Sequence, residues 1–316
     1  MIKELSTDAT KRGTPSLPST GERLLTEFKN QDTVEHLHRY YVACGYAKGK
    51  DVLDIASGEG YGSNLLASHA RSVVGVDISA DAIAHARTKY LRNNLSYKVG
   101  DASSIPLPDN SVDLVVSFET LEHHDKHREM LSEVKRVLRP QGLLIMSTPD
   151  KRTYSDLPAY SNPYHTKELY IEQFESLMKD FFRYVDLLSQ CCRFGSVISP
   201  QKKTAAGFQS FSGDFQDFYI GPIVRDARYV IGVASDTEIP DPSASFHDGT
   251  ELLVAATSED FIQRILKLEA NVESKVKQLQ NIENSLSYKL GRAFTAPLRW
   301  LLASQERALT SDKHMK

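Results

Sequence analysis

The sequence has little cysteine, little net charge and no long apolar run, and each shortage excludes a class of protein. It holds only three cysteines in 316 residues, and Cys191 and Cys192 are adjacent. Three cysteines make no disulfide framework, so we expect a reducing, cytoplasmic location. The net charge of −3 predicts no nucleic-acid partner, because such partners require a strongly basic surface. No run of about 18 apolar residues is present, so we expect no membrane span.

One short stretch predicts a nucleotide site. Val52–Ala56 is an apolar run typical of a buried parallel strand, and three glycines follow it at Gly58, Gly60 and Gly62. A Gly-rich turn between a strand and a helix lets a ligand lie against bare backbone at the helix N-terminus. A dinucleotide fingerprint that begins at Gly58 would need its third glycine at Ser63, so the spacing argues against NAD.

Acidic residues follow the next two predicted strands. Asp77 ends the run Val73–Asp77, where its carboxylate can accept hydrogen bonds from both hydroxyls of a ribose. Asp101 ends a third strand, Tyr97–Ala102, and suits the amino group of an adenine. These positions predict a nucleoside between the two carboxylates.

The pattern of strand and helix continues to residue 148 and predicts a parallel sheet. A turn-rich segment leads into the strand Leu114–Phe118, and a helix is expected over Glu129–Leu138. The Arg139–Gly142 turn and the strand Leu143–Ser147 complete the series.

This ordered series, over roughly residues 50–150, resembles the class I S-adenosylmethionine (SAM)-dependent methyltransferases. The resemblance implies an α/β, Rossmann-like fold with a mainly parallel seven-stranded sheet, an antiparallel last strand, helices on both faces, and SAM as cofactor. The family's first-strand motif is usually D/E-x-G-x-G-x-G, and Ala56 stands here at the first glycine. Alanine is tolerated at that point if it keeps a strand-like φ. The positions expected to bind the cofactor are Arg39, Asp54, Ala56, Gly58, Gly60, Asp77, Ile78, Asp101, Ala102, Phe118 and Glu119.

The methionine end of such a cofactor carries a carboxylate and an ammonium. Arg39 or Arg23 could bind the carboxylate through a two-pronged hydrogen bond. Glu119 follows the fourth strand and is expected at the ammonium.

Histidines are the candidates for catalysis, because a hydroxyl acceptor needs a general base within hydrogen-bond reach. His123 and His124 follow the fourth strand and are the first choice, with His165 second; His36 and His38 could also face the acceptor. For each histidine the alternative is a structural hydrogen bond. No residues have the spacing of a zinc site, so we predict no resident metal, although histidines and carboxylates here would permit Mg²⁺.

Three further motifs resemble a bacterial methyltransferase subgroup of surface-glycan and glycolipid pathways: Gly21–Arg23, Glu35–Tyr40 and Asn162–His165. The expected function is therefore O-methylation of a sugar hydroxyl in a surface polysaccharide, glycolipid or nucleotide-sugar. Two alternatives stay open: a methyltransferase for a quinone, lipid or polyketide, and an interaction protein that binds SAM weakly. An apolar acceptor cavity would favour the small-molecule alternative, and a polar, aromatic groove would favour the sugar.

Around this core, periodicity predicts five further segments. Two helical pieces are expected over 22–48, and a helix capped by Thr166 over Thr166–Lys179. The last two strands are expected at Phe182–Leu188 and Ala227–Ser235, with Phe194–Pro222 between them as an acceptor-side lid or loop.

Four parts are expected along the chain: a flexible lead (1–20), the methyltransferase domain (21–260), a helical or coiled-coil segment (261–290) and a basic amphipathic tail (291–316). The lead is polar and unlike a secretory signal. Ile265, Val272, Leu279 and Leu286 recur every seven residues, which indicates either a short coiled coil or one amphipathic helix. Residues 261–316 carry a net charge of +5 and the first 260 carry −8. We expect the tail to serve self-association, a partner enzyme or the inner membrane surface.

Overall fold

The computed structural model describes most of the N-terminal three fifths of the chain and selected segments beyond it. The described residues are 23–27, 29–192, 210–213, 218–221, 227–239 and 245–249, with the single positions 17, 252, 267, 271, 272, 274, 275, 277 and 278. The chain divides into two units, Met1–Leu253 and Val254–Lys316. Of the four predicted seam residues in the second unit, Val272 is described; it is helical and 60% exposed. The other described positions of the predicted coiled coil are also helical, and Leu17 in the predicted lead is buried in a cluster with Leu25 and Ala82. The predicted tail lies outside the described residues.

Helices and strands alternate through the first unit, as the sequence predicts. The helices are α1 (Gln31–Ala47), α2 (Tyr61–Ala67), α3 (Ala80–Lys89), α4 (His127–Val137) and α5 (Ile171–Lys179), with a 3₁₀ turn η1 (Leu121–His123) and a π-helix η2 (Arg152–Asp156). The strands are β1 (Asp51–Ile55), β2 (Ser72–Asp77), β3 (Leu95–Val99), β4 (Val112–Phe118), β5 (Leu138–Pro149), β6 (Tyr184–Gln190), β7 (Ser210–Gly213), β8 (Phe218–Gly221) and β9 (Tyr229–Ser235).

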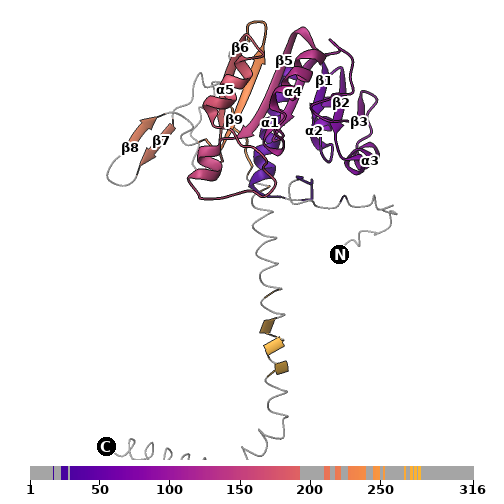
Figure 1. The fold of residues 1–316 in the computed structure, drawn as a ribbon. Helices are drawn as coiled ribbons and strands as arrows, with labels where there is room; N and C mark the ends of the chain where they lie inside the picture. Colours follow the sequence, from indigo (N-terminus) through magenta and orange to yellow (C-terminus); the bar gives the residue numbers. More distant parts are fainter. Residues whose placement is uncertain are drawn as a thin grey trace, which may run out of the picture. The chain divides into compact units, whose positions relative to one another are not determined.

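Seven strands form one sheet in the order β3-β2-β1-β4-β5-β9-β6 (Figure 1). Strands β1 to β5 run parallel to one another, and β9 runs antiparallel to both β5 and β6. The expected Rossmann-like methyltransferase topology, with its last strand antiparallel, is confirmed. The carboxyl ends of β1 to β6 therefore lie at one edge of the sheet, together with the amino end of β9.

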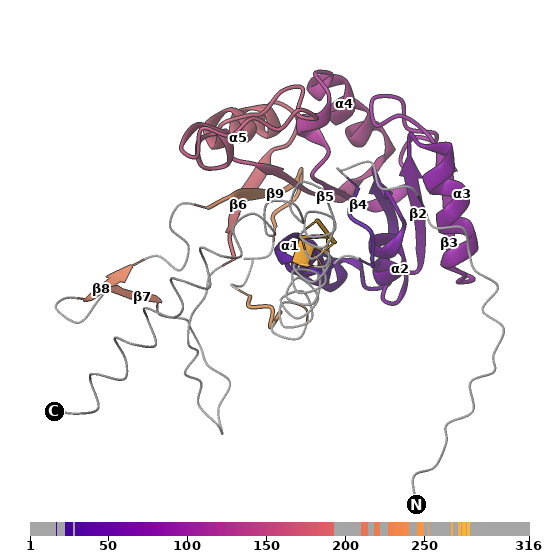
Figure 2. The ribbon, with the colours of Figure 1, turned by 90° about the horizontal axis from the view of Figure 1, so that it is seen from below.

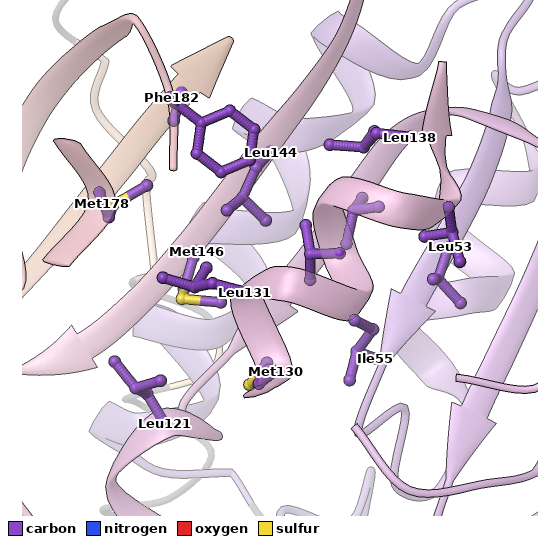
Figure 3. Packing of buried hydrophobic residues seen from close by; sticks show 14 of the residues in the cluster. Leu53, Ile55, Leu121, Met130, Leu131, Leu138, Leu144, Met146, Met178 and Phe182 are labelled. Atoms are coloured by element: carbon purple, nitrogen blue, oxygen red, sulfur yellow. The ribbon is translucent and has the colours of Figure 1, made fainter. Parts of the chain in front are cut away.

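Helices cover both faces of the sheet (Figure 2). Side chains alternate along β1, so that Leu53 and Ile55 face α4 while Val52 and Asp54 face α1 and α2. Leu53 and Ile55 belong to a core cluster with Met130 and other residues of α4 and α5 (Figure 3). Val52 belongs to a second cluster with residues of α1 and α2. Both faces of the central strands are thus buried, as a parallel sheet requires.

The N-terminal helical region and the segment after η2 differ from the predictions. A single helix, α1, takes the place of two pieces, and Asn30 caps it by accepting a hydrogen bond from the Thr33 amide at 2.9 Å. The helix expected from Thr166 begins only at Ile171. The amides of Thr166 and Lys167 donate instead to the carbonyl of Glu122, at 2.8 and 3.0 Å. Thr166 and Lys167 are therefore held against η1 and do not begin a helix.

Two predicted connections contain strand. Residues 139–142, expected as a turn, lie within β5, where pairing with β4 shifts register between Val112 and Leu114. Part of the predicted loop Phe194–Pro222 forms β7 and β8, which pair as a two-stranded antiparallel sheet. The last two strands, β6 and β9, lie where the sequence places them. None of the helices in the described residues is long and apolar enough to cross a membrane.

Candidate functional site

The turn after β1 brings three helices and a strand close to the sheet edge. Gly60 has a φ of 97° and precedes α2. A Cβ atom there would lie 2.8 Å from both Ala86 Cβ and Tyr97 Oη. A Cβ atom at Gly62 would lie only 1.9 Å from Tyr40 Cζ. Glycine is therefore needed at both positions for α1, α2 and β3 to pack around the turn.

Ala56 does not keep the strand-like conformation that the sequence leads us to expect. Its φ is 56°, in the left-handed region, where a Cβ atom approaches the following carbonyl. The turn therefore holds alanine in a conformation that favours glycine, and the condition for tolerating alanine there, a strand-like φ, is not met.

Asp77 lies at the end of β2 against this turn. Its Oδ2 accepts a hydrogen bond from the Gly58 amide and its Oδ1 accepts one from the Ser79 amide, each at 2.8 Å. The residue is 8% exposed, and each carboxylate oxygen has a second lone pair for a ligand. Ile78 beside it is 73% exposed, an unusual exposure for an apolar side chain and one that suits contact with a flat ring.

Asp101 follows β3, the strand next to β2, where Asp77 pairs with Val99. Its Oδ1 accepts hydrogen bonds from the amide and the hydroxyl of Ser103, both at 2.8 Å. These bonds stabilise the ionised form and lower the pKa of Asp101. Ala102 packs against the core on the α4 side. The structure thus brings Asp77 and Asp101 to neighbouring strand ends.

Asp54 lies beneath the turn, fully buried. It accepts hydrogen bonds from Ser63 Oγ at 2.6 Å and from the Tyr40 hydroxyl at 3.2 Å. Burial raises the pKa of Asp54 to about 7, against the effect of these bonds. Its described contacts hold α1 and α2 to the sheet, so its predicted contact with a cofactor stays a prediction. Phe118, another predicted cofactor residue, is 6% exposed and packs edge-on against Tyr40.

A buried arginine lies at the centre of the strand-end edge. Arg39 is 1% exposed, and its Nη1 donates to Gln190 Oε1 at 2.7 Å and lies 3.8 Å from Glu119 Oε1. Its guanidinium carbon lies 4.9 Å from the ring centre of Tyr229. Its Nε is buried and has no hydrogen-bond partner in the described structure. A buried donor of this kind ordinarily has a partner.

Glu119 lies beside Arg39, and we call these two residues the central pair. Its φ is 52°, and its Oε1 accepts a hydrogen bond from Ser147 Oγ at 2.6 Å. A left-handed residue directly after β4 turns the chain sharply, and the following residues form η1. Neither Gln190 nor Tyr229 was predicted at the site. Both lie at the site because the pairing of β6 with β9 places Gln190 opposite Tyr229 at this edge of the sheet. No local sequence motif marks either residue.

Two of the three predicted catalytic histidines meet on the side of β4 away from β1. His123 Nδ1 lies 3.2 Å from the Tyr164 carbonyl, and His165 Nδ1 lies 2.5 Å from Glu168 Oε1. The two imidazole rings meet edge to face, with centres 5.2 Å apart. The carboxylate of Glu168, which sequence reasoning missed, fixes the orientation of the His165 ring.

Glu122 joins these histidines. It is 1% exposed, and its Oε2 accepts a hydrogen bond from Thr148 Oγ1 at 3.1 Å. Burial, followed by the nearby charge of Glu119, raises the pKa of Glu122 well above its usual range. A ligand atom from each of Glu122, His123 and His165 lies within 4.8 Å of the other two. We call these three residues the Glu–His–His cluster.

The other candidate histidines lie apart from this cluster. His124 Nε2 lies 3.3 Å from Met130 Sδ, and the ring packs against His127 of α4. His36 Nδ1 lies 3.0 Å from the Tyr61 hydroxyl, and burial lowers its pKa well below the usual range. His38 Nε2 lies 2.8 Å from Ser245 Oγ. For these three the structural alternative has direct support.

Aromatic side chains surround the Glu–His–His cluster. Tyr154 stacks on His165, with ring centres 5.2 Å apart and planes inclined by 25°. Arg228 lies over the Tyr154 ring at 4.8 Å. Tyr160 and Tyr164 are about half exposed. The described surroundings of the cluster are therefore polar and aromatic.

Known proteins are similar to part of this chain. Residues 53–146 match a family model described as a methyltransferase domain. A protein of Mycolicibacterium smegmatis, described as a probable SAM-dependent methyltransferase, is 38% identical over 169 residues, 52% of this chain and 64% of its own length. The chain thus matches less than two thirds of that relative. A fatty-acid O-methyltransferase of the same organism is 33% identical over 115 residues, 36% of this chain and 41% of its own.

Among solved structures, the YcgJ protein of Bacillus subtilis aligns with a TM-score of 0.43 and 20% identity, over 49% of this chain and 70% of its own. The family match and the names of the relatives support a class I SAM-dependent methyltransferase with SAM as its cofactor. These comparisons do not show the surface-polysaccharide subgroup.

Proposed function

We propose that this chain is a class I SAM-dependent methyltransferase that transfers the cofactor's methyl group to a hydroxyl oxygen of a sugar. The observation that carries the proposal is the Asp77 carboxylate, which the Gly58 amide fixes beside the glycine turn at the end of β2. A carboxylate at this point of a doubly wound sheet can accept hydrogen bonds from both hydroxyls of a ribose. The methyltransferase-domain match over residues 53–146 supports the same placement.

In this proposal the cofactor lies along the carboxyl ends of β3, β2, β1 and β4. Its adenosine lies between Asp77 and Asp101, with the exposed Ile78 against the adenine ring. Its methionine end crosses the glycine turn to the central pair. Glu119 accepts hydrogen bonds from the ammonium, and the buried guanidinium of Arg39 binds the carboxylate.

The transfer itself requires alignment more than covalent help. The acceptor oxygen attacks the methyl carbon, the carbon–sulfur bond breaks, and its electron pair neutralises the sulfonium. The protein gains rate by holding oxygen, carbon and sulfur in one line. The hydroxyl proton must also leave, and the Glu–His–His cluster on the far side of Glu119 is our candidate for activating the hydroxyl.

The surroundings of the cluster favour a sugar acceptor. A sugar ring offers apolar C–H faces to aromatic rings and hydroxyls to polar groups. Tyr154, Tyr160 and Tyr164 supply the rings, and His165 and Arg228 supply polar groups beside them. A fatty acyl chain would need a predominantly apolar cavity instead.

A lipid carboxyl or hydroxyl is the second candidate acceptor. The observation in its favour is the similarity of 115 residues to a fatty-acid O-methyltransferase. The two acceptors differ in the product: a sugar gives a methyl ether, and a fatty acid gives a methyl ester.

The cofactor assignment is tested by calorimetric titration of SAM into the intact protein and its Asp77→Ala variant. Loss of a charged hydrogen-bond partner should weaken binding by about 1.5–3 kcal/mol. Glu129→Ala removes an exposed carboxylate at the start of α4 and is the control, with unchanged affinity expected. Equal SAM affinity in folded Asp77→Ala and wild-type protein would refute the assignment.

The acceptor class is tested with SAM labelled in its methyl group. We expect label to enter nucleotide-sugar or polysaccharide acceptors and to resist mild alkali, as a methyl ether does. Label that enters only fatty acids and is released by mild alkali would replace the sugar with the second candidate.

A further inference from the structure

We propose that Glu122, His123 and His165 together bind a divalent first-row transition-metal ion of the zinc class. The sequence alone predicts no metal here, since no zinc-type spacing is present. The site arises from two segments about forty residues apart. The role of the ion, which is to hold the acceptor hydroxyl, rests on the proposed function; the binding of the ion does not.

The first support is the geometry of the cluster. One carboxylate oxygen and one nitrogen from each imidazole lie within 4.8 Å of one another. Ligands of a tetrahedral zinc ion lie roughly 3.4 Å apart, from metal–ligand distances of about 2.0–2.2 Å. Closing the cluster around an ion therefore asks for side-chain movements of roughly 1 Å, which rotation about χ1 and χ2 can supply.

The backbone already fixes the two segments together. Glu122 and His123 belong to η1, and the Glu122 carbonyl accepts hydrogen bonds from the amides of Thr166 and Lys167. Thr166 Oγ1 also donates to the His123 carbonyl at 3.1 Å. His165 is thus held beside its partners by main-chain bonds that do not involve the ligand atoms.

The second support is the set of groups that orient the ligands. His165 Nδ1 donates to Glu168 Oε1, and both side chains are less than 10% exposed. This bond leaves the lone pair of His165 on Nε2, which is the form of imidazole that binds a metal. Thr148 Oγ1 fixes the Glu122 carboxylate through Oε2. A carboxylate behind a histidine is the usual second partner in zinc sites.

The third support is charge. The Glu122 carboxylate is 1% exposed, and the buried cation Arg39 pairs with Glu119. A divalent ion would supply the missing positive charge at Glu122.

The ligand types narrow the choice of ion. Two imidazole nitrogens and one carboxylate suit Zn²⁺, Co²⁺ and related ions, whereas Mg²⁺ and Ca²⁺ require oxygen ligands almost throughout. Three protein ligands leave one position open. An acceptor hydroxyl bound there would lose its proton more readily, because the ion stabilises the oxyanion.

The test uses untagged full-length protein, freed of metal with a chelator, in the absence of SAM. Co²⁺ alone is titrated and followed by its visible absorption, and Zn²⁺ and Mg²⁺ are added in competition. We expect one Co²⁺ per chain, displacement by Zn²⁺, and no displacement by an equal concentration of Mg²⁺. His165→Ala and Glu122→Gln should each weaken Co²⁺ binding at least tenfold, and Glu168→Gln by about 10–100-fold as a positioning residue.

His124→Ala is the matched control, because this histidine adjoins the cluster in sequence but packs against α4. Its Co²⁺ affinity should equal that of the wild type, and circular dichroism establishes that every variant is folded. Absence of a one-to-one Co²⁺ complex, or equal affinity in Glu122→Gln, His165→Ala and wild type, overturns the proposal.

Titration of SAM into the same metal-free protein separates this inference from the proposed function. SAM binding and full turnover without metal would refute the role of the ion in holding the acceptor hydroxyl and would leave the methyltransferase proposal standing. Co²⁺ binding without SAM binding would refute the proposed function and leave the metal site standing.

Discussion

The two halves of the sheet edge are built in different ways. The cofactor half comprises the turns after β1, β2 and β3, and its contacts join residues closer in sequence. Asp77 binds Ser79, two residues away, and Gly58, 19 residues away, and Asp101 binds Ser103, two residues away. The acceptor half comprises η1, His165 and the segments around them. Its contacts join distant residues, such as His123 with Tyr164 and with Thr166, 41 and 43 positions apart.

This difference matches the two tasks of the site, which are recognition of the invariant nucleoside and recognition of one particular acceptor. Backbone amides and strand-end acids recognise parts of a nucleoside that do not vary, so short motifs suffice. An acceptor is recognised by side chains gathered from several loops, which can change without disturbing the sheet. A substitution in one half, with measurements on both halves, tests this separation.

The largest expected effect is on the acceptor half. His165→Asn should lower turnover about 10²–10⁴-fold while leaving SAM affinity nearly unchanged, because this histidine lies beyond the predicted cofactor path. Single-turnover kinetics and calorimetry measure the two quantities. His124→Asn is the comparison, with a much smaller effect expected. Full turnover in His165→Asn together with its loss in His124→Asn would reverse our assignment of the two histidines.

The next largest effect is expected on the pH dependence of stability, through Asp54, the buried carboxyl beneath the cofactor half. The pKa of Asp54 is raised to about 7 in the folded protein, and that of an unfolded chain is about 3.9. Between these values the unfolded chain binds fewer protons, so stability should fall as pH rises from 4 to 7, by up to about 1.4 kcal/mol per unit. Asp54→Asn should remove this part of the slope in urea unfolding. Parallel pH profiles for variant and wild type would count against the burial argument.

A packing change in the cofactor half should be somewhat smaller. Gly62→Ala places a methyl group against the Tyr40 ring, which Tyr61 and Phe118 already hold at its edges. Overpacking of this kind costs about 1–3 kcal/mol in the free energy of unfolding. Gly45→Ala in α1 is the control, because its Cβ would meet nothing within 4 Å and a small gain is expected. Equal stability of the two variants would contradict the close approach of α1 and α2.

The smallest effect is expected at Ala56. A left-handed alanine costs about 1–2 kcal/mol, and glycine loses about 0.5–1 kcal/mol through its greater freedom when unfolded. Ala56→Gly should therefore stabilise the protein by at most about 1.5 kcal/mol in urea unfolding, and Ala56→Val should destabilise it. A destabilised Ala56→Gly variant would show that the methyl group has a packing role that its φ does not reveal.

The same contrast explains what the sequence could and could not predict. Gly58, Asp77 and Asp101 were found because each lies within a few residues of a recognisable apolar strand. The mainly parallel seven-stranded sheet and its antiparallel last strand followed from the family resemblance and are confirmed. Gln190 and Tyr229 escaped notice because only the folded sheet brings them to the edge. Glu168 lies only three residues from His165, and no recognisable motif marked the pair. The sequence predicts a helix cap at Thr166, but the Thr166 amide donates to the carbonyl of Glu122. This partner is distant in sequence, so no local pattern reveals it.

The position of β9 also has a consequence for how the chain is made. Within the sheet, β6 pairs with β9, which lies between it and β5 and is synthesised about forty residues later. Strands β1 to β5 can form as they leave the ribosome, but β6 must wait for its neighbour. A nascent chain that stops before Tyr229 lacks β9, so the edge of β5 stays unpaired and β6 has no strand to pair with. We therefore expect incomplete chains to aggregate or be degraded.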